Sequence, residues 1–302
     1  MTILHADDDI DPKSERARFL FARGGWPAFH RINFDIDLIF SAAEEWKRDL
    51  EGLDKAWLVW NAHDDWCSVQ QRLVESVGWT PLVGCDPRVG KPTNLSKNAI
   101  FYDFNKTLKL PFLHPVFVLE FVFLFIDKLA FWHSDLLLPT EKMQTLADLF
   151  DELEDGQTCA VKHWHKKRFW RKPQRAWELV GCTTKNASLN QYEVGSGWWS
   201  NIYAHINCPD EKEAIYRKNK VNWDHGAGIK YWKDRYGGDL KYIPLEYVEK
   251  GHFSPTSHPK LFARQKHAIG RDLNSQLDSQ TGVTAACNLV GLDYIKLMSD
   301  YE

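Results

Sequence analysis

One stretch of sequence decides the fold, Leu129-Ala130-Phe131-Trp132-His133-Ser134-Asp135-Leu136-Leu137-Leu138-Pro139. It is an apolar run interrupted by two side chains that can bind metal ions, His133 and Asp135. Side chains of a β-strand alternate between its two faces. A buried strand that ends on these residues therefore places an imidazole and a carboxylate on one face at its carboxyl edge. Open α/β sheets bind nucleotides at this edge.

Two more strands are predicted nearer the N-terminus. Lys55–Asn61 and Thr80–Cys85 are short apolar runs, each followed by acidic or turn-forming residues. Between them, Asp64 or Asp65 can cap a helix that Gly78 ends. The segment therefore predicts two strands joined by a helix.

A loop and a buried helix complete this half of the chain. Residues 88–98 combine turn-forming and basic side chains, which is typical of a loop. Pro115 suits the first turn of an apolar helix that continues over Val116–Asp127. Because strands and helices alternate, we expect an α/β fold with a Rossmann-like mixed central sheet and helices on both faces.

The second half of the chain continues the alternation. We expect an amphipathic helix over Glu141–Glu154 and strands over Gln157–Lys162 and Leu240–Pro244. An aromatic helix precedes the last strand and stops at Tyr236-Gly237-Gly238.

The composition is that of a globular protein. Its 302 residues are 44% apolar, ample for a buried core, and the formal net charge of -3 gives no overall attraction to polyanions. The six cysteines form no Cys-x-x-Cys pair, which argues against a zinc knuckle and favours reduced thiols. The N-terminus has no signal-peptide pattern, and charges interrupt the apolar segment 115–132. We therefore expect a cytoplasmic protein with no membrane contact.

Four features, in order, resemble the GT-A fold of metal-dependent, nucleotide-sugar glycosyltransferases. In that family an apolar strand precedes an Asp-x-Asp motif, a glycine-containing strand follows, an acidic residue starts a helix, and a histidine comes late. The corresponding residues here are His133-Ser134-Asp135, Gly195-Ser196-Gly197, Asp224 and His252, with His133 in place of the first acid. The resemblance implies that the glycine-containing strand covers Glu193–Tyr203.

The resemblance implies both a domain organisation and an activity. A GT-A-like catalytic domain covers residues 55–260, between an N-terminal extension (1–54) packed on the core and a C-terminal extension (261–302). The implied reaction moves a sugar from a nucleotide-sugar donor, expected to be UDP-linked, to a hydroxyl acceptor with the help of a divalent metal ion.

The expected metal ligands are Asp135 and His252. His133 is a third ligand or contacts the ribose or phosphate of the donor. Sugar transfer loads negative charge on the departing diphosphate, and a hard divalent cation stabilises that charge as a Lewis acid. Imidazole suits Mn²⁺ better than Mg²⁺, so the histidines favour manganese. The alternative is that His133 is an ordinary hydrogen-bonded histidine at the end of a strand.

Asp224 is the candidate catalytic residue. In an inverting enzyme its carboxylate accepts the proton of the acceptor hydroxyl, and in a retaining enzyme it stabilises the cationic face of the sugar. The alternative is a helix N-cap followed by a turn at Gly226 and Gly228. His225 is a second candidate base.

Donor-binding residues are expected beyond the first two strands. Asp64 and Asp86 can accept hydrogen bonds from ribose hydroxyls or a uracil N–H, and Arg88 can neutralise phosphate. Capping and turn formation explain the two carboxylates equally well.

The segment from Lys162 to Trp177 holds seven Lys or Arg residues, four aromatic residues and no acid. Such a pattern is typical of binding to nucleic acid or another polyanion. It predicts a polyanionic acceptor, for example modified DNA, in contact with Lys166, Lys167, Arg168 and Trp170. A solvated loop, or one that grips the donor diphosphate, is the alternative.

Trp198 and Trp199 can form a sugar platform, although core packing also explains them. A rival from another class is a catalytically inert GT-A-like protein that binds nucleic acid through the basic segment, since the first acid of Asp-x-Asp is missing. A nucleotidyltransferase, which releases pyrophosphate, is a third possibility.

Overall fold

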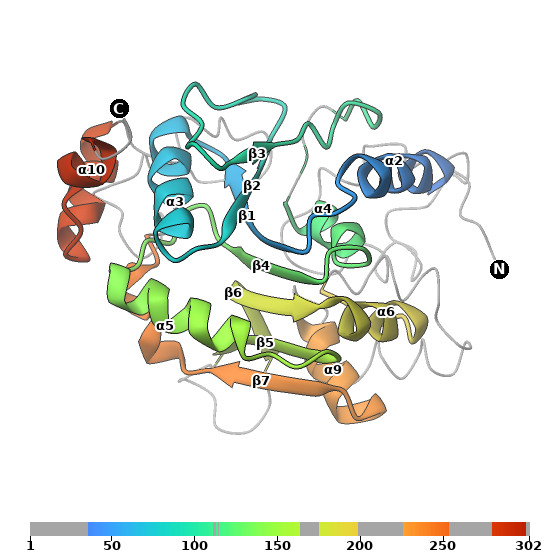
Figure 1. The fold of residues 1–302 in the computed structure, drawn as a ribbon. Coiled ribbons are helices and arrows are strands. Elements are labelled where there is room, and N and C mark those ends of the chain that lie inside the picture. The colour runs from blue at the N-terminus through green and yellow to red at the C-terminus, as the bar shows by residue number, and fades with distance from the viewer. Residues whose placement is uncertain are drawn as a thin grey trace, which may run out of the picture.

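Seven strands form the central sheet. The structure, a computed structural model, describes residues 36–110, 113, 115–163, 175–198, 226–253 and 280–299. Its strands are β1 (Lys55–Asn61), β2 (Thr80–Cys85), β3 (Ile100–Phe101), β4 (Lys128–Trp132), β5 (Gln157–His163), β6 (Arg175–Thr184) and β7 (Asp239–Ile243). They lie in the order β3-β2-β1-β4-β6-β5-β7, and within these ranges β6 alone is antiparallel to its neighbours (Figure 1).

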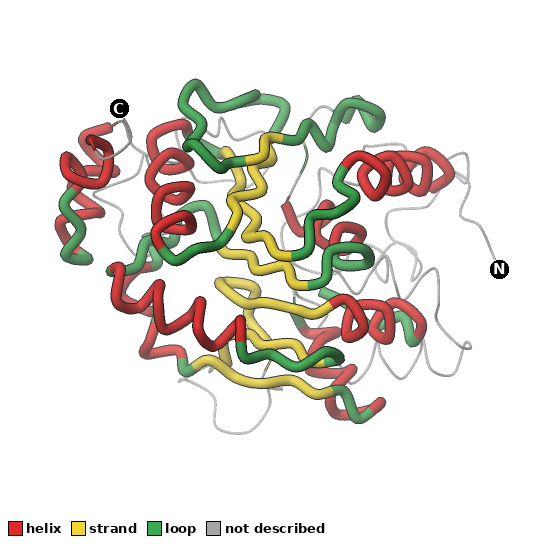
Figure 2. The backbone as a smooth tube through the Cα atoms, viewed as in Figure 1, coloured by secondary structure: helices red, strands yellow, loops and turns green. Residues whose placement is uncertain are grey.

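Helices lie on both sides of the sheet (Figures 1 and 2). One side carries α3 (Asp64–Ser76), α5 (Thr140–Asp151), α10 (Gln280–Leu289) and α11 (Tyr294–Ser299). The other side carries α2 (Ile36–Asp49), α4 (Pro115–Val122), α6 (Lys185–Glu193) and α9 (Ala227–Tyr236). Two short 3-10 helices, η2 (Leu245–Tyr247) and η3 (Glu249–Gly251), follow β7. This arrangement confirms the predicted α/β fold with a mixed sheet covered on both faces.

The alternation of side chains along β1 fills both apolar layers. Trp57 and Val59 pack towards α3 and α5, while Leu58 and Trp60 pack towards α2 and α4. A strand buried on both faces reads as a continuous apolar run, since neither face meets water. The bounds of β1 and β2 therefore agree with the sequence prediction to the residue.

Several of the tryptophans form a cluster in the core. The ring of Trp57 lies 5.1 Å from Trp132, 5.1 Å from Phe150 and 5.8 Å from Trp79, measured between centroids. Such tilted and edge-on contacts add to the free energy gained by burying each ring. The chain has 14 tryptophans, and packing between sheet and helix accounts for Trp57, Trp79 and Trp132 among them.

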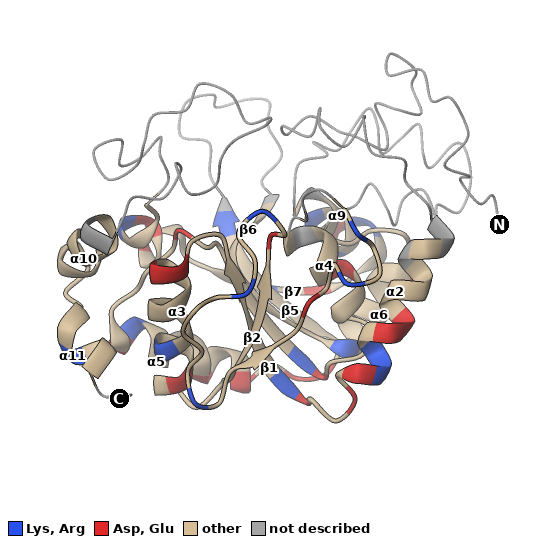
Figure 3. Cartoon of the chain, turned by 90° about the horizontal axis from the view of Figure 1, so that it is seen from above, with Lys and Arg blue, Asp and Glu red and all other residues tan. Residues whose placement is uncertain are grey.

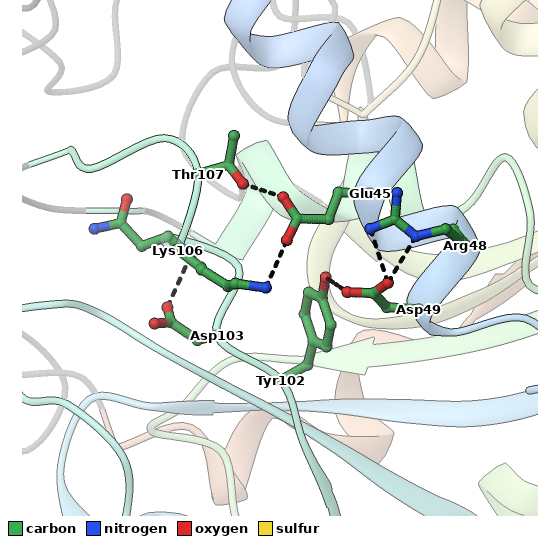
Figure 4. A network of polar contacts seen from close by, with 8 residues as sticks. Glu45, Arg48, Asp49, Tyr102, Asp103, Lys106 and Thr107 are labelled. Carbon is green, nitrogen blue, oxygen red and sulfur yellow. Dashed lines mark hydrogen bonds and ion pairs between the residues drawn. The ribbon is translucent and has the colours of Figure 1, made fainter.

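Polar contacts attach α2 to the chain after β3 (Figure 4). Lys106 pairs with Glu45 at 2.9 Å, and Thr107 donates to the same carboxylate. The Tyr102 hydroxyl donates to Asp49 at 2.9 Å. Trp46 on the same helix is buried, and its ring centroid lies 5.2 Å from that of Phe104 and 6.3 Å from that of Phe121. Helix α2 therefore packs on the core.

Surface charge and cysteines agree with the composition. Acidic and basic residues are interspersed along the described elements (Figure 3). Five cysteines carry free, buried thiols: Cys67, Cys85, Cys159, Cys182 and Cys287. None of the described helices combines the length and the apolar character that crossing a membrane requires.

The prediction of a strand over Glu193–Tyr203 is wrong for residues 193–198, the part of this range that the structure describes. Glu193 is the last residue of α6, and a turn follows in which the Ser196 amide donates to the Gln191 carbonyl at 2.8 Å. Strand β6 (Arg175–Thr184) comes before this stretch, and its first residues lie in the basic segment Lys162–Trp177. The helix predicted over Val116–Asp127 is shorter in the structure than predicted, since α4 ends at Val122.

Candidate metal centre

The turn after β4 carries His133 and Asp135. The strand ends at Trp132, so the two residues lie beyond it, contrary to the prediction that the strand ends on them. The Leu136 amide donates to the His133 carbonyl at 3.1 Å and closes the turn. It is this turn, and not the alternation of side chains along a strand, that places both side chains on the same side.

A buried glutamine on α3 holds this turn. The Gln70 side-chain amide donates to the His133 carbonyl at 2.8 Å and to the Leu136 carbonyl at 2.9 Å. Gln70 is fully buried. Since buried carbonyls need hydrogen-bond partners, this one side chain stabilises both ends of the turn.

Backbone pairing brings His252 to the turn from far along the chain. The Phe253 amide donates to the Asp135 carbonyl at 2.8 Å, and the Leu137 amide donates to the Gly251 carbonyl at 3.0 Å. A Cβ atom on Gly251 would lie 2.0 Å from the Leu137 carbonyl oxygen. Only glycine allows the two backbones to approach so closely.

The three predicted ligands, His133, Asp135 and His252, come together. Their ligand atoms all lie within 4.8 Å of one another. Asp135 Oδ1 is 3.4 Å from His252 Nε2 and 3.7 Å from His133 Nδ1. Donor atoms that share one transition-metal ion at bonds of about 2.1 Å lie roughly 3 to 4 Å apart. One carboxylate oxygen and two imidazole nitrogens therefore fit a divalent cation such as Mn²⁺.

The electrostatics of the cluster favour a charged carboxylate. Burial raises the pKa of Asp135, but the imidazoles of His133 and His252 outweigh it and hold that pKa well below its usual range. Burial likewise lowers the pKa of His133, whereas Asp135 and Glu178 raise it, and the net effect brings the pKa to about 9. Without a metal ion, the cluster is thus stabilised by a protonated imidazole between two carboxylates.

Glu178 and Trp177 belong to this site and were missed from the sequence. Glu178 Oε1 lies 3.8 Å from His133 Nε2. The ring of Trp177 lies 5.3 Å from that of His252 and 6.4 Å from that of His133. Both residues come from β6. The available signal was a single acid inside the apolar run Ala176-Trp177-Glu178-Leu179-Val180.

The site lies where the connections of the sheet change direction. Strand β1 has β2 on one side and β4 on the other. In open α/β sheets, ligands bind at the carboxyl ends of the two strands that flank such a switch point. Asn61 ends β1, and His133 follows β4. The candidate metal centre is therefore at the edge that the fold favours for a ligand.

Asn61 is a third residue near the site that the sequence did not point to. Its side chain is fully buried, and its Nδ2 donates to Asp64 Oδ1 and to the Gly90 carbonyl, both at 2.9 Å. Within the described part of the chain, its Oδ1 accepts no hydrogen bond. A buried acceptor without a donor is costly. A ligand donor at the end of β1 would satisfy it.

The predicted donor contacts Asp64, Asp86 and Arg88 hold the loop after β2. Asp64 accepts from the Thr93 amide and hydroxyl at 3.2 and 3.0 Å. Asp86 binds the Arg88 guanidinium through both oxygens at 2.9 and 3.0 Å. The described contacts are thus the turn-forming ones. Asp64 is the first residue of α3 and not its cap, since His63 is the N-cap.

The remaining predicted residues differ in what the structure describes. Trp198 is 1% exposed and its ring centroid lies 4.7 Å from that of Phe131. Its ring is therefore part of the core, which corrects the sugar-platform prediction for this residue. The others lie outside the described residues: Trp199, Asp224, Lys166, Lys167, Arg168 and Trp170.

No family model matches this chain, and no curated protein is significantly similar to it.

Proposed function

We propose that this protein is a GT-A-type glycosyltransferase that moves a sugar from a nucleotide-sugar, UDP-linked, to a hydroxyl acceptor with the help of Mn²⁺. The observation that carries the proposal is the meeting of His133, Asp135 and His252 at the carboxyl edge of β4. The mixed sheet with helices on both sides, and the switch point beside β4, support a nucleotide at this edge.

The chemistry assigns a task to each ligand. A divalent cation bound here supplies positive charge against the diphosphate that leaves the sugar. Asp135 provides the charged oxygen, and its low pKa keeps it ionised at neutral pH. His252 and His133 provide nitrogens, which favour manganese over magnesium. Asn61 Oδ1 is available to accept a hydrogen bond from the base or ribose.

Two parts of the proposal come from the sequence alone. Asp224 acts at the anomeric carbon, as the base of an inverting enzyme or as the stabilising carboxylate of a retaining one. The basic aromatic segment with Lys166, Lys167, Arg168 and Trp170 contacts the acceptor, for which modified DNA is the concrete candidate.

The test is Mn²⁺-dependent turnover of nucleotide-sugars. Donor hydrolysis and transfer are measured with Mn²⁺ and with EDTA, and we expect activity that Asp135→Ala and His252→Ala abolish. Asp148→Ala, on the exposed side of α5, is the control and keeps full activity. Turnover that survives EDTA and Asp135→Ala would contradict the proposal. Salt-sensitive DNA binding without turnover would favour the inert, nucleic-acid-binding alternative.

A second candidate follows from the donor set. Two histidines and one carboxylate also form the metal site of non-haem Fe(II) oxygenases. Anaerobic Fe(II) binding followed by oxygen uptake would support that class. The parallel strands and their switch point favour nucleotide chemistry instead.

A further inference from the structure

We propose that Glu178 is a positioning residue that orients His133 for metal binding. This inference rests on the proposed metal centre and adds to it a residue outside the three ligands.

The pairing of β6 with β4 places Glu178 beside His133. Trp132 lies opposite Val180, and the His133 amide donates to the Leu179 carbonyl at 2.9 Å. This register sets the position of Glu178 on the neighbouring strand, and its side chain is 11% exposed. The carboxylate is therefore held by the sheet itself and not by a loop.

The two ring nitrogens of His133 face different carboxylates. Nδ1 is 3.7 Å from Asp135 Oδ1, the oxygen that also lies 3.4 Å from His252 Nε2, and Nε2 is 3.8 Å from Glu178 Oε1. An imidazole that binds a metal through one nitrogen carries its hydrogen on the other, and a carboxylate there fixes the tautomer and the ring orientation. The geometry makes Nδ1 the metal-binding nitrogen and Nε2–H the donor to Glu178.

Glu178 acts from outside the coordination sphere. It is not among the residues whose ligand atoms lie within 4.8 Å of one another. The 3.8 Å separation exceeds a hydrogen bond, so we expect the ring to turn and the contact to shorten when the metal ion binds. The neighbouring Trp177 ring lies edge-on to that of His133, with their centroids 6.4 Å apart.

The experiment measures the affinity for Mn²⁺ alone by chelator competition, in the full chain and three variants. Glu178→Leu is expected to weaken binding about 10- to 100-fold. Glu178→Gln keeps an oxygen that accepts the Nε2 hydrogen, so its affinity should lie between those of Leu and the parent. Glu141→Gln, an exposed acid on α5, is the matched control and should bind as the parent does.

A second measurement separates orientation from general damage to the fold. In protein labelled with ¹⁵N-histidine and loaded with diamagnetic Zn²⁺, the Nε2–H of His133 should give a slowly exchanging proton signal. Glu178→Gln should keep this signal and Glu178→Leu should lose it, while both melt cooperatively in EDTA.

The outcomes distinguish this inference from the proposed function. If the parent binds Mn²⁺ and Asp135→Ala does not, yet folded Glu178→Leu binds as tightly as the parent, Glu178 has no positioning role. If the parent itself binds no divalent metal, the metal centre fails, and the role of Glu178 fails with it.

Discussion

Replacing Gln70 by leucine tests how the turn that carries His133 and Asp135 is held. The change removes two hydrogen bonds, of 2.8 and 2.9 Å, from a side chain of similar size that is fully buried. The His133 carbonyl keeps the Leu136 amide as a donor. The Leu136 carbonyl loses the donor that Gln70 supplies, so the two carbonyls are affected unequally.

The magnitude follows from these contacts. Losing the bond to His133 costs about 1 kcal/mol, and leaving the Leu136 carbonyl without Gln70 costs about 1 to 3 kcal/mol. The substitution also removes Gln70 Oε1, a buried acceptor that accepts no hydrogen bond in the described part of the chain. Removing it offsets about 1 kcal/mol of the lost stability. The net loss is about 2 kcal/mol, or roughly 3 °C in melting temperature for a chain of 302 residues. If metal binding must re-form the turn, the same free energy weakens Mn²⁺ binding by up to about 30-fold.

The assay combines thermal unfolding in EDTA with Mn²⁺ titration. The matched control is Gln71→Leu, since Gln71 is equally buried on the same helix but bonds to Asn94 and Ser96 instead. We expect the control to lose stability and keep its Mn²⁺ affinity. A Gln70→Leu protein with the melting temperature and the Mn²⁺ affinity of the parent would refute the reasoning.

Three further predictions concern the same region and the core. Gly251→Ala forces a Cβ to within 2.0 Å of the Leu137 carbonyl oxygen, so the melting temperature should fall and Mn²⁺ binding should be lost together; intact binding would show that the close approach is dispensable. In EDTA, the raised pKa of His133 contributes roughly 3 kcal/mol to the stability of the folded protein. This contribution is fully present below pH about 6.5 and should be lost as the pH rises through about 9. Urea unfolding checks it, and His133→Asn should flatten the profile. The Cys159 thiol is buried and its pKa is raised to about 12. A disulfide reagent at pH 8 should therefore modify it in urea but not in the native protein. Fast labelling of Cys159 in the native protein, located by mass spectrometry, would contradict this.

The sequence predicts the elements whose burial is simple. Strands β1 and β2 are apolar runs bounded by polar residues, so their limits can be read directly. Strand β6 combines apolar residues with Arg175 and Glu178, next to a run of basic residues, and its place beside β4 depends on long-range pairing. That pairing has no local signal, so the single acid inside the apolar run does not by itself place Glu178 at the site.

The site shows the same division. The proximity of Asp135 and His252 was expected from the order of motifs, and the structure brings them together. How the chain brings them together could not be predicted from one sequence, because this depends on backbone pairing between residues 135–137 and 251–253. Likewise, nothing in the sequence near Gln70 indicates that its side chain supports a turn more than sixty residues away.

Trp177 gives the molecule an optical reporter of its own. The indole lies 5.3 Å from the imidazole of His252, measured between ring centroids, so an ion held by that histidine would sit beside a fluorophore. Paramagnetic Mn²⁺ quenches nearby indole emission, whereas diamagnetic Zn²⁺ does so far less. Occupancy could then be followed in unlabelled protein as the difference between the two ions, and Trp177→Phe should remove most of that difference.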